Sequence, residues 1–274
     1  MTHNTPVTII TGASEGIGAE LARQLATRHG AGMRLVLAAR KRDALETVAA
    51  SCRAKGSQVA VVPTDVSVEA QCRNLIQATL DAFGRIDTLV NNAGVSAQAL
   101  FQDVDALDLH WYEDLMRVNL WGSVWCTHAA LPHLKQTQGR IVAVSSLAGL
   151  IGVPGRTAYS ASKFAMTGFF EALRAELRPS GVSVTTAFPG VVLTDIRAHG
   201  LNAKGDIAGS SGLKEDKAMT VSECAYLIAS GMQKRQREVV MTAQGKLGRF
   251  LKLLLPRVVE NMALAALKDD VKPQ

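Results

Sequence analysis

A tyrosine, a lysine and a serine are spaced in this chain as proton transfer at an alcohol or carbonyl carbon requires. Tyr159 and Lys163 are four residues apart, so a helix places them on one face, a turn from each other. A lysine ammonium beside a phenol favours the phenolate, which can exchange a proton with an alcohol oxygen near neutral pH. Ser146, thirteen residues before Tyr159, could hold the same oxygen by a hydrogen bond, and Ser145 is the weaker candidate. The alternative interpretation of Tyr159 and Lys163 alone is a solvated surface pair.

A glycine-rich turn near the N-terminus predicts a site for the hydride carrier that such chemistry needs. Glycines let the backbone turn tightly and approach a pyrophosphate, and a helix N-terminus offers free N–H groups. The β-rich run Val7–Thr11 precedes this turn and a helical pattern follows it, which is the context that the motif requires. The candidate cofactor contacts in the turn are Gly12, Ser14, Glu15, Gly16, Ile17 and Gly18. The alternative is a plain tight turn between a strand and a helix.

The end of the second expected strand indicates which dinucleotide would bind. NAD-binding sites place an acidic residue there for the ribose 2′-hydroxyl. Here Ala39 occupies that place, and Arg40, Lys41 and Arg42 follow it. Arg40 can fork onto a 2′-phosphate, and Lys41 or Arg42 can add positive charge. The sequence therefore favours NADP(H) over NAD(H). A basic helix start is the alternative, although it would oppose the helix dipole.

From about Val7 to Thr242 the chain resembles the short-chain dehydrogenase/reductase family. Five motifs occur in the family's order: the glycine turn, Asn91-Asn92-Ala93-Gly94, Ser146, the Tyr159 and Lys163 pair, and Pro189-Gly190-Val191-Val192-Leu193-Thr194. From Ser145 through the C-terminal tail, the chain is similar to the branch of 11β-hydroxysteroid-dehydrogenase-like and DHRS7-like enzymes. That branch handles steroids, retinoids and other lipophilic carbonyls.

The resemblance implies roles for positions that match the family's motifs. Asn119 would bind a proton-relay water through its backbone near Lys163, and Lys163 would also bond the nicotinamide ribose. The implied contacts near the adenine and its ribose are Asp65, Val66, Asn92, Ala93 and Gly94. The implied contacts near the nicotinamide are Tyr159, Lys163, Pro189, Gly190, Val192 and Thr194.

Alternating strands and helices predict an α/β fold with a single doubly wound parallel sheet of about seven strands, a Rossmann fold. The resemblance implies the strand order 3-2-1-4-5-6-7. The expected strands are Val7–Thr11, Arg34–Ala38, Gln58–Val62, Thr88–Asn91, Arg140–Ser145, Ser183–Phe188 and Glu238–Thr242. The expected helices are Gly16–His29, Ala44–Lys55, Val68–Phe83, Leu107–His133 in two pieces ending near Pro132, Tyr159–Leu177 and Ser222–Lys234.

One domain is expected over residues 1–274, with two additions to the sheet and its helices. Ala203–Ala218 is rich in Gly, Ser, Lys and Asp and predicts a mobile loop, and a lid loop is expected over about residues 195–218. Residues 245–268 predict a helical C-terminal extension in which Pro256 separates two helices. Basic and aliphatic residues alternate in this tail. Packing on the domain or on a partner subunit is favoured, and a peripheral contact with a membrane surface is the alternative.

Composition excludes several classes of protein. The chain has 274 residues, 47% hydrophobic, and a net charge of +6 scattered along its length, so a globular protein without a nucleic-acid-binding stripe is expected. No apolar run of about 18 residues and no signal peptide is found, which predicts a cytoplasmic protein. The four cysteines are far apart and are expected to be reduced thiols. No metal-ligand motif occurs, so no metal is expected. The resemblance implies a homodimer or homotetramer.

The combined prediction is an NADPH-dependent carbonyl reductase or alcohol dehydrogenase that acts on a lipophilic ketone or secondary alcohol. Tyr159 would be the general acid in reduction and the general base in oxidation, supported by Asn119, Ser146 and Lys163. The small and apolar residues that follow Ser146 favour a lipophilic substrate. A 3-oxoacyl thioester reductase is the main alternative. A non-catalytic protein that senses NADP(H) is the other.

Overall fold

Seven parallel strands form one sheet in the order β3-β2-β1-β4-β5-β6-β7, which confirms the predicted topology. The computed structural model describes residues 5–105, 109–216 and 218–268. Lys217, within the expected lid, lies outside them. The strands are β1 (Val7–Thr11), β2 (Arg34–Ala39), β3 (Gln58–Pro63), β4 (Thr88–Asn91), β5 (Arg140–Val144), β6 (Ser183–Phe188) and β7 (Glu238–Val240).

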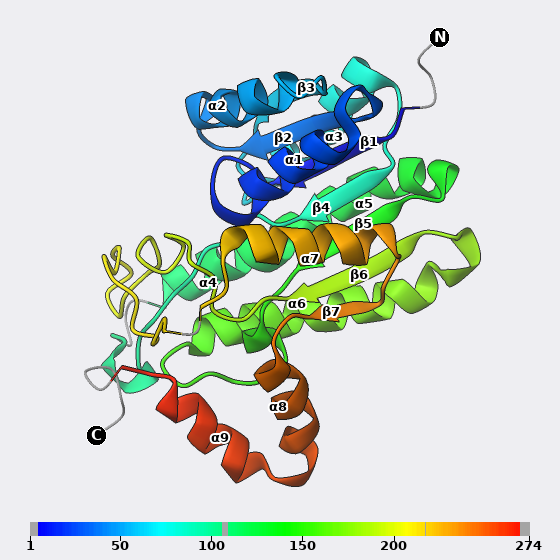
Figure 1. The fold of residues 1–274 in the computed structure, drawn as a ribbon. Helices are drawn as coiled ribbons and strands as arrows, with labels where there is room; N and C mark the ends of the chain where they lie inside the picture. The colour runs from blue at the N-terminus through cyan, green and yellow to red at the C-terminus, as the bar shows by residue number, and fades with distance from the viewer. Residues whose placement is uncertain (1–4, 106–108, 217, 269–274) are drawn as a thin grey trace.

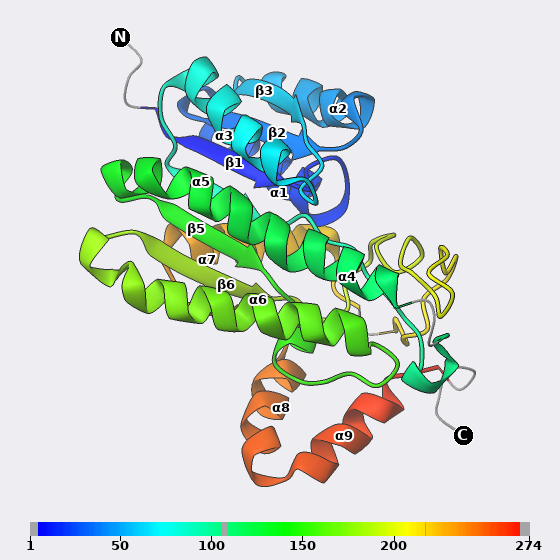
Figure 2. The same cartoon turned by 180° about the vertical axis from the view of Figure 1, so that it is seen from behind.

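Helices cover both faces of the sheet (Figures 1 and 2). One layer is formed by α1 (Gly16–His29), α2 (Arg42–Arg53) and α7 (Val221–Gln233). The other contains α3 (Glu69–Phe83), α4 (His110–Met116), α5 (Gly122–Thr137) and α6 (Thr157–Glu176). A hairpin of α8 (Ala243–Leu254) and α9 (Pro256–Ala265) extends from the sheet beyond β7.

The central strands are apolar on both sides because each side packs under a helical layer. In β1, Ile10 belongs to the cluster beneath α1 and α7, whereas its neighbour Ile9 belongs to the cluster beneath α3, α5 and α6. Successive side chains of a strand point to opposite faces, so a strand buried on both faces reads as a continuous apolar run. This explains why the strands could be located from the sequence.

The parallel register brings the carboxyl ends of the strands to one edge of the sheet. Thr11 of β1 is aligned with Ala38 of β2, and Asn91 of β4 is aligned with Ala143 of β5. The segments that follow these strands therefore meet along a common edge. In open α/β sheets, ligands bind at this edge, where the strand order reverses.

The helical region around Asn119 departs from the expectation in one respect. A π-helical turn at Arg117–Trp121 joins α4 to α5, in agreement with two helical pieces. The expectation that the second piece ends near Pro132 is wrong, because α5 continues to Thr137. Proline removes one backbone N–H and crowds the preceding turn. Here Leu134, beyond the proline, is buried in the core, as is Ala130 before it, and this packing continues the helix.

The C-terminal segment returns to residues 190–216, which lie between β6 and α7. Leu213 pairs with Leu267 in an isolated bridge. Lys214 N donates to Ala266 O at 3.1 Å, and Lys268 N donates to Gly212 O at 2.9 Å. Pro256 is the first residue of α9, where its missing N–H costs nothing. Among the described residues, no helix has the length and hydropathy needed to cross a membrane.

Candidate active site

Tyr159 and Lys163 lie on one face of α6, as their spacing predicts. The Lys163 Nζ is 5.7 Å from the centroid of the Tyr159 ring. Tyr159 is 9% exposed, and within the described chain no residue forms a hydrogen bond with its Oη. The phenol oxygen is therefore available to an oxygen atom of a bound molecule.

Lys163 is buried, and its position is fixed by the end of β5. Its Nζ donates to Val144 O at 3.0 Å and contacts Met166 Sδ at 3.9 Å. Burial lowers the pKa of Lys163, and negative charge on Tyr159 raises it again in part. An ammonium has three donors. Only one oxygen acceptor is found for them in the described structure, so Lys163 retains donors for a ligand.

The two serines after β5 differ in what their hydroxyls contact. Ser145 Oγ is buried against α6, where it donates to Lys163 O at 3.2 Å and lies 3.1 Å from Thr167 Oγ1. Ser146 is half-buried, and its Oγ accepts a hydrogen bond from Ala148 N at 3.2 Å. The Ser146 hydroxyl can still donate its proton, whereas that of Ser145 is used internally. The geometry therefore favours Ser146 as the serine that can meet a substrate.

Asn119 ties three segments together from the π-helical turn. Its Oδ1 accepts from Val95 N at 2.8 Å, and its Nδ2 donates to Val95 O at 3.0 Å. The same Nδ2 donates to Ser162 Oγ at 2.9 Å, next to Lys163 on α6. The side chain of Asn119 is thus fully engaged in joining the loop after β4 to α6. Single π-helical turns of this kind are frequent at functional sites.

The glycine turn lies at the N-terminus of α1 and leaves its amide groups uncapped. Ala19 N is the first amide of α1 with a helical acceptor, and Glu15 at the N-cap makes no side-chain capping bond. A side chain at Gly18 would approach Gly12 O to 2.3 Å, so only glycine allows the turn to close this tightly. Gly16 faces Thr194 of the segment after β6. The free N–H groups and the helix dipole fit a bound diphosphate.

Arg40 and Lys41 lie between β2 and α2, and both are exposed. Neither forms an ion pair within the described chain, and Lys41 precedes α2 without a side-chain cap. These unpaired cations beside a helix N-terminus suit a phosphate group.

Asp65 and Val66 follow β3 and are held in place by local contacts. Asp65 Oδ1 accepts from Ser67 N at 2.9 Å and from Ser67 Oγ at 2.7 Å. The Val66 side chain packs so closely on Gly122 of α5 that a Cβ at Gly122 would lie 2.8 Å from that of Val66. These two residues therefore form a fixed rim beside the end of the sheet.

Asn92 and Ala93 bind the glycine turn to the end of β4. Asn92 Nδ2 donates to Thr11 O at 2.9 Å and to Gly12 O at 3.2 Å. Ala93 N donates to Thr11 Oγ1 at 3.0 Å. Gly94 lies beside Asn119 and Lys163, with Lys163 Nζ 3.5 Å from where its Cβ would be. The loop after β4 thus links the glycine turn to the residues around Tyr159.

The segment after β6 faces the serines and the glycine turn. Pro189 O accepts from Leu147 N at 2.9 Å. Gly190 approaches Thr242, which begins the turn into α8. Val192 is buried and pairs with Met219. Thr194 lies beside Gly16, and Leu201 pairs with Ala97 of the loop after β4, so this segment joins the glycine turn to that loop.

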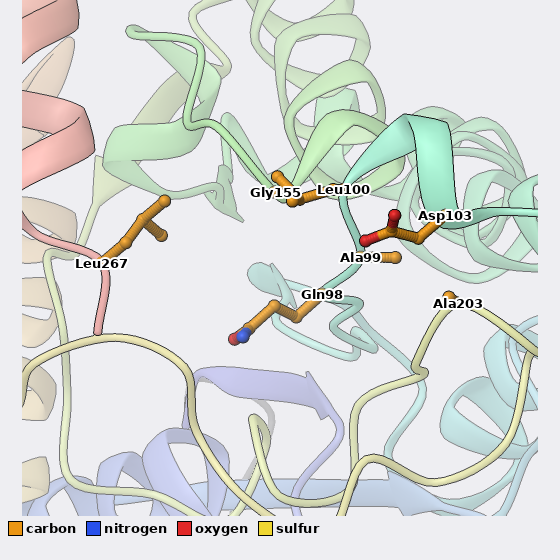
Figure 3. A pocket seen from close by; sticks show the side chains of 7 residues that line it. All are labelled: Gln98, Ala99, Leu100, Asp103, Gly155, Ala203 and Leu267. Atoms are coloured by element: carbon orange, nitrogen blue, oxygen red, sulfur yellow. The ribbon is translucent and has the colours of Figure 1, made fainter. Parts of the chain in front are cut away.

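A cavity of roughly 210 Å³ opens beside the start of α6 (Figure 3). Its lining joins the loop after β4, the segment after β6 and the C-terminal end: Gln98, Ala99, Leu100, Asp103, Gly155, Ala203 and Leu267. Sequence reasoning missed these residues because they are far apart in the chain. It also missed Arg156, whose guanidinium lies on the ring of Tyr159. A cation directly before a helix N-terminus is unfavourable. The position of Arg156 before the helix that carries Tyr159 was therefore the sequence signal for a special role.

The chain matches the short chain dehydrogenase family over residues 6–204. It is therefore a member of that family, as the motifs indicated. An 11-beta-hydroxysteroid dehydrogenase-like protein 4A from Arabidopsis thaliana is 43% identical over 235 residues, which is 84% of this chain and 74% of that protein. A dehydrogenase/reductase SDR family protein 7-like from Dictyostelium discoideum is 33% identical over 276 residues, 98% of this chain and 84% of its own. These relatives confirm the branch.

Two of the solved structures with a similar fold are of microbial proteins. An alcohol dehydrogenase from Thermococcus sibiricus, solved with 5-hydroxy-NADP, has a TM-score of 0.72 and 26% identity, covering 86% of this chain and 94% of its own. A short chain dehydrogenase/reductase from Burkholderia phymatum, solved with NAD, has a TM-score of 0.78 and 26% identity, covering 100% of this chain and 99% of its own.

Proposed function

We propose that this protein is an NADP(H)-dependent oxidoreductase that interconverts a lipophilic ketone and its secondary alcohol. The observation that carries the proposal is the pairing of a phenol with a free Oη, Tyr159, and a buried ammonium, Lys163, on one helix face. When bound, the nicotinamide would supply or accept the hydride. The chain itself then has to bind the substrate oxygen and move one proton.

Tyr159 Oη carries that proton. In reduction it would donate the proton to the carbonyl oxygen, and in oxidation it would take the proton from the alcohol. The Lys163 ammonium would stabilise the phenolate. Ser146, whose hydroxyl can still donate, would hold the substrate oxygen, and Asn119 would support the proton relay through its backbone. The buried setting strengthens each of these charge interactions.

The preference for NADP(H) is supported by the charge between β2 and α2. Arg40 and Lys41 are exposed and unpaired within the described residues, and Ala39 offers no carboxylate for a ribose 2′-hydroxyl. The glycine turn, Asp65, Val66, the loop after β4 and the segment after β6 would bind the remainder of the dinucleotide. The open diphosphate site at α1 fits either dinucleotide, so the preference rests on the charge between β2 and α2.

A lipophilic substrate is supported by the apolar side chains near Ser146 and the cavity. Leu147 and Ile151 follow Ser146 and contact the glycine face of α8 at Gly245 and Gly248. Leu100 and Leu267 line the neighbouring cavity. We propose that residues 195–218 act as the lid over this cavity, within a single domain.

The test is oxidation of NADPH and NADH, followed by nicotinamide absorbance, against ketones from small aryl ketones to steroids and 3-oxoacyl thioesters. Tyr159→Phe is expected to lower turnover by at least about a hundredfold, because it removes the proton donor, while NADPH binding stays unchanged. Preference for 3-oxoacyl thioesters would identify the alternative reductase. NADPH binding without turnover of any panel member would favour the sensing role and contradict this proposal.

We also propose a homodimer or homotetramer that assembles through the outer faces of α5 and α6. Trp121 is 48% exposed and stacks on Trp125 with ring centroids 5.9 Å apart. Phe164 on α6 is also partly exposed, and Lys252 of α8 lies over its ring at 4.7 Å. Exposed aromatic residues on neighbouring helices are typical of protein contacts.

The α8–α9 hairpin is a separate surface, and we propose that it makes a peripheral contact with an anionic membrane. The face of α8 toward the domain is formed by Gly245 and Gly248. Large apolar side chains lie on its exposed side instead, namely Leu247, Phe250, Leu253 and Leu254. Packing on the domain therefore does not account for them. Nearby Lys246 and Arg257 supply positive charge.

A further inference from the structure

A second cation lies against the ring of Tyr159. Arg156 immediately precedes α6 and is only 7% exposed. Its guanidinium carbon is 4.5 Å from the centroid of the Tyr159 ring. A guanidinium at this distance from a ring face is attracted by the electron density of the ring, more strongly when both groups are desolvated.

Arg156 has no acidic partner in the described parts of the chain. One of its terminal amino groups hydrogen-bonds to Ser96 Oγ, and its buried Nε has no acceptor. The nearby Arg197 differs, because it pairs with Glu215 at 2.7 Å. Burial lowers the pKa of Arg156, negative charge on Tyr159 raises it, and Arg197 lowers it. An arginine nevertheless stays protonated in a protein. Among the described residues, Tyr159 is therefore the group that can place a negative charge against the buried Arg156.

The backbone holds Arg156 in this position. Arg156 N donates to Val153 O at 3.1 Å, and Ser160 N donates to Arg156 O at 2.8 Å. Ala99 N donates to Gly155 O at 2.8 Å, which joins this turn to the loop after β4. The backbone of Arg156 is thus fixed on two sides, and its guanidinium is held between Ser96 Oγ and the ring of Tyr159. Fixed charges stabilise a developing charge without reorganising.

We propose that Arg156 is a positioning residue for proton transfer, which holds the ring of Tyr159 and, with Lys163, stabilises negative charge on its Oη. This inference rests on the proposed function, in which Oη gives its proton to a carbonyl oxygen or takes one from an alcohol. The charged groups that face Tyr159 in the described chain are Arg156 and Lys163, and Arg197 with Glu215 lies behind Arg156. Without Arg156 the phenolate would lose one of its two cations.

The first experiment is the pH profile of kcat/KM for alcohol oxidation, in which the phenolate accepts the proton and activity rises with pH. Arg156→Met removes the charge and keeps much of the side chain's length. Its rising limb is expected to move about one pH unit upward, the lower end of the effect of a charge at this range. Arg156→Lys should keep the limb near its wild-type position while lowering kcat, since the flat ring contact is lost.

Arg174→Met is the matched control. Arg174 lies on the same helix and hydrogen-bonds to Val184 O at 2.9 Å and Thr186 Oγ1 at 2.8 Å, away from Tyr159. Its loss should lower stability without moving the limb. If Arg156→Met loses activity while its limb stays at the wild-type pH, Arg156 is merely structural and the proposal is overturned. If Arg156→Met does not fold, Arg156→Lys and Arg156→Gln are compared instead. The proposal then requires the rising limb of the pH profile to lie at higher pH in Arg156→Gln, which lacks the charge, than in Arg156→Lys, which keeps it.

A second measurement does not need turnover. The chain has three tyrosines, so the tyrosinate absorbance of the free protein can be followed with pH and the Tyr159 signal isolated with Tyr159→Phe. Arg156→Met should move the midpoint of that signal upward by about one unit. An unchanged midpoint overturns the role of Arg156, whatever the activity panel gives. A shifted midpoint in a protein that turns over no substrate would count against the proposed function alone.

Discussion

At the scale of single residues, some polar side chains of the site form hydrogen bonds within the fold, whereas others can still bond to a ligand. Ser145 and Ser146 are neighbours, yet Ser145 Oγ is bonded to α6 whereas Ser146 can still donate. The side-chain amide of Asn119 is likewise hydrogen-bonded within the fold, to Val95 and Ser162. Strand alternation explains the difference between the serines, because adjacent side chains at a strand end point to opposite faces.

This contrast gives a matched pair of variants. Ser146→Ala is expected to lower kcat/KM by about a hundredfold, the usual effect of losing a donor to a reacting oxygen, with little change in melting temperature. Ser145→Ala should do the reverse, because it removes hydrogen bonds in the core worth about 1 kcal/mol of stability. Steady-state kinetics and thermal unfolding measure both. A larger kinetic loss for Ser145→Ala would reverse the assignment.

At the scale of elements, the sequence was most informative where the signal is local. The buried strands, the helix after the glycine turn and the pair on α6 follow from short-range periodicity. They lie where expected, except that some strand ends differ by one or two residues, as in β7, which ends at Val240 and not at Thr242. The continuation of α5 past Pro132 was not predictable, because tertiary packing overrides a local helix breaker. Arg156 and Leu267 reach the site through contacts with distant segments. Contacts between distant segments produce no periodic pattern of residues in a single sequence, so they could not be predicted from it.

The connection between β2 and α2 decides the choice of dinucleotide in our proposal. Arg40→Ala should weaken NADPH binding by about tenfold or more, because a hydrogen bond to a charged group contributes about 1.5–3 kcal/mol, and should leave NADH binding nearly unchanged. Lys55→Ala, an exposed cation beyond the other end of α2, is the control. Titration of both variants with both cofactors gives the answer. Equal losses for NADPH and NADH would remove Arg40 from 2′-phosphate recognition.

At the scale of the whole molecule, the C-terminal segment returns to the region of the candidate site. The C-terminal segment after α9 pairs with Leu213 and places Leu267 in the cavity beside α6. In Figure 3, Leu267 lies across that cavity from Asp103 and Ala203. The α8–α9 hairpin therefore connects the outer surface to the segment that we propose as the lid. We therefore expect a contact made by the hairpin to affect the proposed lid segment beside this cavity.

The outward apolar face of α8 makes the last prediction specific. Leu253 is 81% exposed, and burying a leucine contributes about 1.5–3 kcal/mol, so Leu253→Glu should weaken binding to vesicles by tenfold or more. Sedimentation with vesicles of phosphatidylserine and phosphatidylcholine measures this, with pure phosphatidylcholine expected to bind less because the hairpin is basic. Val68→Glu places the same charge at an exposed apolar residue far from the hairpin and should bind as wild type does. A different outcome would assign this face to a partner subunit instead. In that outcome the wild-type protein binds neither kind of vesicle, and the Leu253→Glu variant no longer forms the oligomer.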